Sequence, residues 1–140
     1  AQAFGEPPSE DELIVHLVIP FLRALGWPPE RIAMKWRNVD VALFRALPRT
    51  PENCQVVIEA KRLGAGVEQA LDQAVGYVRA LATRADVLVT DGFRYRLYAS
   101  PSVGGSPSEI DTAQFEPAAY ANLVRLKKPA TELFLRLQRV

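Results

Sequence analysis

The sequence predicts a mixed α/β domain in which helices flank a central sheet. The expected order is helix, three strands, helix and two strands (αβββαββ), followed by C-terminal helices. An apolar stripe at helical spacing runs through residues 13–25, and a second one at residues 67–81 lies between two short apolar runs. Strand, helix and strand in succession indicate a parallel return, and therefore a mixed sheet with helices on both faces. With 140 residues, we expect a single domain at residues 1–140.

The first helix is predicted to begin after Ser9, because Ser9 and Glu12 have the spacing of a capping box. Gly26 should end it, and Pro20 should kink or break it. Glu10 lies on the row of the apolar stripe and leans toward the core side, although an ordinary first-turn acid would fit as well. The stripe consists of Leu13, Ile14, Leu17, Val18, Phe21, Leu22 and Leu25.

Two strands are expected next, at residues 31–37 and 39–44, with a break at Asn38. In the second, Asp40 shares a face with apolar side chains. Burying a carboxylate there is costly unless it is paired or binds a cation. Asp40 is therefore either a metal ligand or a residue that caps or bridges a neighbouring strand.

The third strand, at residues 55–61, ends in Glu59-Ala60-Lys61. Since side chains alternate along a strand, Glu59 and Lys61 leave the same face and Ala60 the other. Sites that hydrolyse phosphodiesters use such a pair. The carboxylate holds a hard cation, and the lysine orients the attacking water and offsets negative charge. A salt bridge on a surface edge strand has the same pattern.

The second helix covers residues 67–81. Gln73 and Tyr77 border its apolar stripe at i, i+4 spacing. If this helix packs over the strand that carries Glu59 and Lys61, the amide and the phenol would face the same cleft. There they could hold a nucleic-acid backbone or fix the lysine, but ordinary packing and solvation would give the same pattern.

A strand pair is expected at residues 86–90 and 93–98, joined by the hairpin signal Asp91-Gly92. Arg94 and Arg96 share one face of the second strand. We interpret that face as the solvated side of an edge strand, although the arginines could also meet phosphates.

The C-terminal part carries no motif for a site. Residues 101–107 are rich in Gly, Ser and Pro and predict a loop. Residues 120–126 and 131–137 predict two short helices that cover the sheet and close the domain.

Composition limits the chemistry that is available. The net charge of +1 speaks neither for nor against nucleic acid. Because the chain has one cysteine and one histidine, an internal disulfide and a transition-metal cage are excluded, and carboxylates would have to hold a metal such as Mg²⁺, Mn²⁺ or Ca²⁺. No apolar run approaches ~18 residues. We therefore expect a cytoplasmic protein with no signal peptide and no membrane contact.

The motifs in this order resemble the PD-(D/E)xK nuclease superfamily, and within it the N-terminal nuclease domain of type I restriction enzyme motor subunits. The resemblance covers residues 9–99. It is carried by Ser9-Glu10, Gly26-Trp27, Val39-Asp40, Glu59-Ala60-Lys61, Gln73, Tyr77 and Val89-Thr90-Asp91-Gly92. The chain has Val39 where the superfamily motif has proline. It contains no helicase motor, so ATP-driven activity is not implied.

The resemblance implies a restriction-endonuclease-like core and a Mg²⁺-dependent DNA endonuclease, with Mn²⁺ as a substitute, in a restriction or other defence system. Asp40, Glu59 and the carbonyl of Ala60 would hold the metal. The metal would polarise the scissile phosphate and lower the pKa of a bound water, and Lys61 would orient that water.

For three further residues, the resemblance supplies most of the evidence. Glu10 would assist at the metal or its water, and Gln73 and Tyr77 would steady the site or the DNA backbone. The implied partners are DNA and other domains or subunits of a larger restriction complex, and a homodimer is also open. Two alternatives remain: a catalytically silent nuclease-like fold used for nucleic-acid binding or assembly, and a nuclease that processes junctions or ends.

Overall fold

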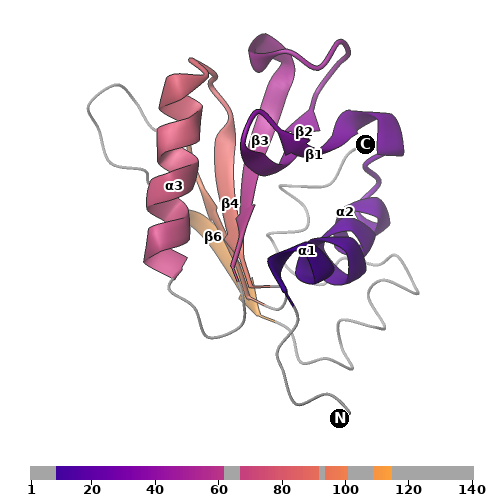
Figure 1. The fold of residues 1–140 in the computed structure, drawn as a ribbon, viewed down its shortest axis with the longest axis vertical. Helices are drawn as coiled ribbons and strands as arrows, with labels where there is room; N and C mark the ends of the chain where they lie inside the picture. The colour runs from indigo at the N-terminus through magenta and orange to yellow at the C-terminus, as the bar shows by residue number, and fades with distance from the viewer. Residues whose placement is uncertain (1–8, 62–66, 92–93, 101–108, 115–140) are drawn as a thin grey trace.

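The computed structural model describes residues 9–61, 67–91, 94–100 and 109–114 of the chain (Figure 1). Its centre is a six-stranded sheet in the order β1-β2-β3-β4-β5-β6. The strands are β1 (Ile32–Trp36), β2 (Val39–Phe44), β3 (Cys54–Ala60), β4 (Asp86–Thr90), β5 (Arg94–Tyr98) and β6 (Glu109–Gln114). β3 and β4 run parallel, and the other neighbouring pairs are antiparallel. The predicted mixed sheet with a parallel return is confirmed.

Helices lie on both faces of this sheet, as predicted (Figure 1). On one face, α1 (Glu10–Leu13), a π-helical turn (Ile14–Val18) and α2 (Ile19–Ala24) follow one another without a break in the helical path. On the other face, α3 (Val67–Ala80) packs over β3 and β4. Side-chain alternation along β3 serves both layers, because Ile58 packs in the core under α2 and Val57 in the core under α3.

The first helical segment begins with the predicted capping box. Ser9 Oγ accepts the N–H of Glu12, and Glu12 Oε1 accepts the N–H of Ser9. The predicted break at Pro20 takes the form of a π-helical turn, in which the N–H of Ile19 donates to the carbonyl of Ile14 five residues earlier. Since Pro20 has no N–H to donate, a widened turn just before it keeps the chain helical.

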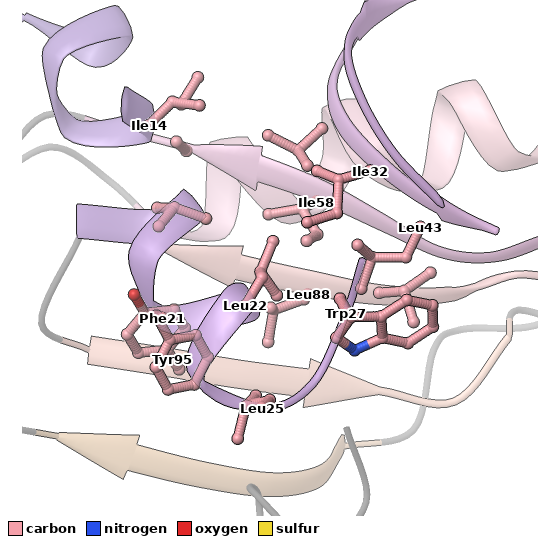
Figure 2. Packing of buried hydrophobic residues seen from close by; sticks show 14 of the residues in the cluster. Ile14, Phe21, Leu22, Leu25, Trp27, Ile32, Leu43, Ile58, Leu88 and Tyr95 are labelled. Atoms are coloured by element: carbon pink, nitrogen blue, oxygen red, sulfur yellow. The ribbon is translucent and has the colours of Figure 1, made fainter. Parts of the chain in front are cut away.

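Gly26 ends this segment with a φ of 100° and turns the chain into the core. The N–H of the next residue, Trp27, donates back to the carbonyl of Leu22 over 3.2 Å. The Trp27 indole is buried, and Phe21 stacks on Tyr95 of β5 with ring centroids 4.3 Å apart (Figure 2). These aromatic residues help to hold the segment against the sheet.

β1 and β2 form a tight hairpin where the sequence predicts a break. Trp36 pairs with Val39, so Arg37 and Asn38 are the two turn residues, with φ of 47° and 71°. Positive φ at both central residues is typical of the type I′ turn that connects twisted antiparallel strands. Lys35, two residues before Arg37, also has a positive φ, of 55°.

The prediction that Arg94 and Arg96 lie on an edge strand is wrong. β5 pairs with β4 on one side and with β6 on the other. The strand β6 was not predicted from the sequence. The predicted loop at residues 101–107 and the predicted helices at 120–126 and 131–137 lie outside the described residues. None of the helices in the described part of the chain has the length and apolarity needed to cross a bilayer.

Candidate functional site

Asp40 and Glu59 lie opposite each other on β2 and β3. Ala42 pairs with Val57, and the same register two residues further along each strand places Asp40 across from Glu59. Ala42 and Val57 both belong to the core under α3. Because side chains alternate, Asp40 and Glu59 leave the sheet on that same face. Two acids that are 19 residues apart in the sequence are therefore neighbours in space.

Each of the two carboxylates accepts a backbone N–H from the opposite strand. The N–H of Asp40 donates to Glu59 Oε1 over 3.3 Å, and the N–H of Ala60 donates to Asp40 Oδ2 over 3.0 Å. Since the N–H and the carbonyl of a strand residue leave on the same side, the carbonyl of Ala60 also faces β2. The structure thus brings Asp40 and Glu59 together, and the Ala60 carbonyl that the resemblance adds to them faces the same strand.

Glu59 is strongly affected by its surroundings. Its side chain is buried, with 4% exposure for the residue. Burial, and next the charge of Asp40, raise the pKa of Glu59 to about 7, against the opposing effects of the Asp40 N–H and the Lys61 charge. Two adjacent acids, one of them buried, form a setting in which a hard cation is favourable.

Lys61 follows β3 and is half-buried. Its N–H donates to the carbonyl of Thr90 over 2.9 Å, which extends the pairing of β3 with β4 by one residue. Strand alternation puts its side chain on the face of Glu59, and its charge lowers the pKa of that carboxyl. Lys61 makes no ion pair with an acid of the described residues. The alternative of a surface salt bridge on an edge strand does not fit, because β3 is central and Glu59 is buried.

The charges of the two acids act on Tyr77 of α3, whereas Gln73 forms no hydrogen bond with either acid in the described part of the chain. Burial, followed by the charges of Glu59 and Asp40, raises the pKa of the Tyr77 phenol, which is therefore within electrostatic reach of both carboxylates. Gln73, one turn earlier, is exposed and makes no hydrogen bond to either acid in the described part of the chain. The roles predicted for these residues stay predictions.

Asp11 of the N-terminal helix is linked to Asp40 through Lys35, while Glu10 has no such link. Glu10 is half-buried and forms no hydrogen bond or ion pair with Asp40 or Glu59. Asp11 Oδ1 lies 2.9 Å from Lys35 Nζ, and the same nitrogen lies 3.4 Å from Asp40 Oδ1. The role predicted for Glu10 at the metal stays a prediction.

Lys35 is a site neighbour that the sequence analysis missed. It lies across the β1–β2 hairpin from Asp40, between the pairs Met34–Val41 and Trp36–Val39. Its hydrogen bond to Asp11 is the largest of the causes that raise the pKa of its ammonium. Interpreting Asn38 as part of a two-residue hairpin turn would have placed Lys35 opposite Asp40.

Comparison with solved structures gives a similar fold. The chain resembles a fragment of a protein assigned as the HsdR subunit of a type I restriction enzyme from Vibrio vulnificus YJ016, with a TM-score of 0.54 and 18% sequence identity. The similarity covers 88% of this chain and 26% of that one. The chain has a restriction-endonuclease-like core. No protein-family model and no curated protein matches it.

The donor set on this restriction-endonuclease-like core fits a hard divalent cation. The carboxylates of Asp40 and Glu59 and the carbonyl of Ala60 offer oxygen only, which suits Mg²⁺ or Mn²⁺ better than zinc. Within the described residues, no group of three or more His, Cys, Asp and Glu side chains is arranged to hold a metal. Mg²⁺ does not require such a group, because it commonly binds one or two carboxylates and keeps several waters.

Proposed function

We propose that this chain is a divalent-metal-dependent DNA endonuclease domain of a restriction or other defence system. The observation that carries the proposal is the placement of Asp40 directly opposite Glu59 on the same face of the sheet, with the Glu59 pKa raised to about 7. The likeness of fold to a restriction enzyme subunit supports DNA as the substrate. Because the chain spans 26% of that protein, partner domains or subunits belong to the proposal.

The residues of the site divide the work of phosphodiester hydrolysis. Asp40, Glu59 and the carbonyl of Ala60 would hold the cation. When bound, Mg²⁺ or Mn²⁺ supplies Lewis-acid chemistry at the scissile phosphate. Lys61, whose ammonium is free of ion pairs with described acids, orients the attacking water and offsets the negative charge that develops on the phosphate.

Three residues take supporting roles in this proposal. Tyr77 lies near the carboxylates and steadies the site or the DNA backbone beside them. Gln73 is exposed one turn away on α3, where its amide is available to the backbone of bound DNA. Glu10 at the start of α1 assists as a further acid at the metal or its water.

Nicking of supercoiled plasmid in Mg²⁺ and in Mn²⁺ tests the proposal. Asp40→Asn and Lys61→Ala should each lower the nicking rate by about 100-fold or more, because each removes charge at the reacting phosphate. The matched control is Glu52→Gln, which removes an exposed acid in the 3₁₀ turn Pro51–Asn53 before β3. Circular dichroism checks that each variant is folded. A wild-type protein that cuts no DNA with either metal contradicts the proposal.

The second candidate is a catalytically silent nuclease-like fold that binds nucleic acid or serves assembly. The contact between Lys35 and Asp40 favours it, because it gives a proposed metal ligand a positive partner from the chain itself. Such a protein would shift DNA in a gel without cutting it. A junction- or end-processing nuclease would instead cut branched or linear DNA in preference to the plasmid.

A further inference from the structure

Lys35 connects the start of the N-terminal helix to the candidate metal ligand Asp40. Its Nζ lies 2.9 Å from Asp11 Oδ1 and 3.4 Å from Asp40 Oδ1. The other oxygen of Asp40, Oδ2, accepts the N–H of Ala60. Both oxygens of the Asp40 carboxylate are therefore in contact with donors of the chain itself.

The exposure of Lys35 and its second acidic contact allow its ammonium to move away from Asp40. The side chains of Lys35 and Asp11 are 55% and 71% exposed, whereas that of Asp40 is 14% exposed. The shorter of the two contacts is with Asp11, so the ammonium keeps an acidic partner when it moves away from Asp40. By contrast, the N–H of Ala60 is fixed in the backbone.

The unusual backbone conformation of Lys35 favours one defined position for its side chain. Lys35 has a φ of 55°, which residues with a side chain adopt rarely, and it lies directly across the hairpin from Asp40. Residues held in such conformations cluster at functional sites, where the surrounding structure maintains them. The strained backbone and the contact with Asp40 are two separate observations on the same residue.

We propose that Lys35 is the internal counter-cation of Asp40, that a divalent metal displaces it, and that Asp11 retains the displaced ammonium. An ammonium and a metal ion cannot both lie against Asp40 Oδ1, because like charges at contact distance repel strongly. Lys35 and Asp11 are then positioning residues that set the affinity of the site for its metal. This inference rests on the proposed function, since it takes Asp40 as a metal ligand.

Mn²⁺ binding by the whole chain, without DNA, is the readout. Free Mn²⁺ is measured by electron paramagnetic resonance at an ionic strength of about 10 mM, where screening is weak. Lys35→Met, which keeps the aliphatic stem but removes the charge, should lower the Mn²⁺ Kd by about threefold to fivefold. Asp11→Asn should raise the Kd by about twofold, because Lys35 loses its other partner and stays on Asp40.

The double variant tests whether Asp11 affects Mn²⁺ binding through Lys35 or through its own negative charge. In Lys35→Met/Asp11→Asn the Kd should equal that of Lys35→Met, because Asp11 acts only through Lys35. Simple attraction of Mn²⁺ by Asp11 would instead raise the Kd again in the double variant, and would overturn the role of Asp11. Arg37→Met is the matched charge control. It removes one positive charge from the same hairpin, where Arg37 Cζ lies 5.0 Å from the ring centroid of Trp36, and the Kd should change by less than about twofold.

The outcomes distinguish the inference from the proposed function. An equal Kd for wild type and Lys35→Met overturns the inference and leaves the proposed metal site in place. Binding by Lys35→Met but not by wild type supports the inference in its strongest form. If none of the variants binds Mn²⁺ while circular dichroism shows them folded, the proposed metal site fails, and the inference with it.

Discussion

The backbone N–H of Asp40 donates to the carboxylate of Glu59, its partner on the neighbouring strand, over 3.3 Å. This one bond does not compensate for the burial of Glu59 beside a second acid, and the pKa of Glu59 is raised to about 7. When no cation is bound and both carboxylates are charged, the burial of Glu59 beside Asp40 therefore lowers the free energy of unfolding. The free energy of unfolding, measured without DNA or metal, should show this loss.

We expect the metal-free protein to lose stability as the pH rises from about 4.5 to 7. Burial and then the Asp40 charge raise the pKa of Glu59 from 4.5 to about 7 in the folded state. The folded protein thus keeps a proton that the unfolded chain has already released. The associated stability is fully present below pH 4.5 and is lost as the pH passes 7. The loss should be on the order of 2–3 kcal/mol, measured by urea unfolding in EDTA at pH 5 and pH 8.

Glu59→Gln provides the comparison, because it keeps an oxygen acceptor for the Asp40 N–H but does not titrate. At pH 8 it should be more stable than wild type, and at pH 5 it should be similar. Glu52→Gln, at an exposed acid, should keep the wild-type dependence. Mg²⁺ or Mn²⁺ added at pH 8 should stabilise wild type and not Glu59→Gln. A wild-type protein that is equally stable at pH 5 and pH 8 would rule out the raised pKa.

The candidate acids could be found from the sequence, but their meeting could not. Asp40 and Glu59 stand out because each interrupts an apolar strand, and alternation gives the face on which each side chain lies. The register between β2 and β3 depends on the connection between them. Arg45 binds that connection through the carbonyl of Glu52, and a one-residue slip would have separated the two acids. Lys35 was missed because its position opposite Asp40 depends on the length of the turn between β1 and β2.

The elements up to residue 98 could be predicted because each has an apolar pattern of its own. β6 has no such pattern, since the segment Glu-Ile-Asp-Thr-Ala-Gln mixes two acids with few residues that favour strands. It is a strand because it pairs with β5, and strand propensity depends strongly on such context. The same limit explains the wrong prediction for Arg94 and Arg96, because whether a strand is an edge depends on its neighbours.

Removal of the Arg94 side chain should destabilise the protein substantially. Asp91, directly after β4, is 1% exposed, and Arg94 reaches it with Nε at 2.7 Å and Nη2 at 2.6 Å from Oδ2. The N–H of Arg94 also donates to Asp91 Oδ1 over 2.9 Å. Arg94→Ala leaves the Asp91 carboxylate buried and removes both guanidinium contacts to it. We therefore expect the free energy of unfolding in urea to fall by about 2–4 kcal/mol.

Arg96→Ala is the matched control for this ion pair, because it removes the same side chain from the same strand. Arg96 is partly exposed, and its loss should cost less than about 1 kcal/mol. Arg94→Lys should fall between the two, since an ammonium cannot make the paired contact of a guanidinium. Equal costs for Arg94→Ala and Arg96→Ala would show that the Asp91 contact contributes little.

Replacing Ala82 by glycine should stabilise the protein. The chain leaves α2 and α3 in the same way. Gly26 and Ala82 have positive φ (100° and 52°), and the residue after each donates to a carbonyl five residues back over 3.2 Å. Glycine adopts this conformation without the steric cost that a side chain pays. Ala82→Gly should therefore raise the free energy of unfolding by about 0.5–1 kcal/mol, and Gly26→Ala should lower it by about 1 kcal/mol.

Gly76, inside the α3 helix that Ala82 follows, gives the opposite substitution as a control. It lies on the exposed side of α3, and a Cβ added there would meet nothing within 4 Å. Gly76→Ala should raise the free energy of unfolding by about 0.5–1 kcal/mol, because alanine is the better residue in a helix interior. Both changes should thus stabilise the protein, although one adds a methyl group and the other removes it. If Ala82→Gly instead destabilised the protein while Gly76→Ala stabilised it, the entropy lost by glycine would outweigh the strain at residue 82.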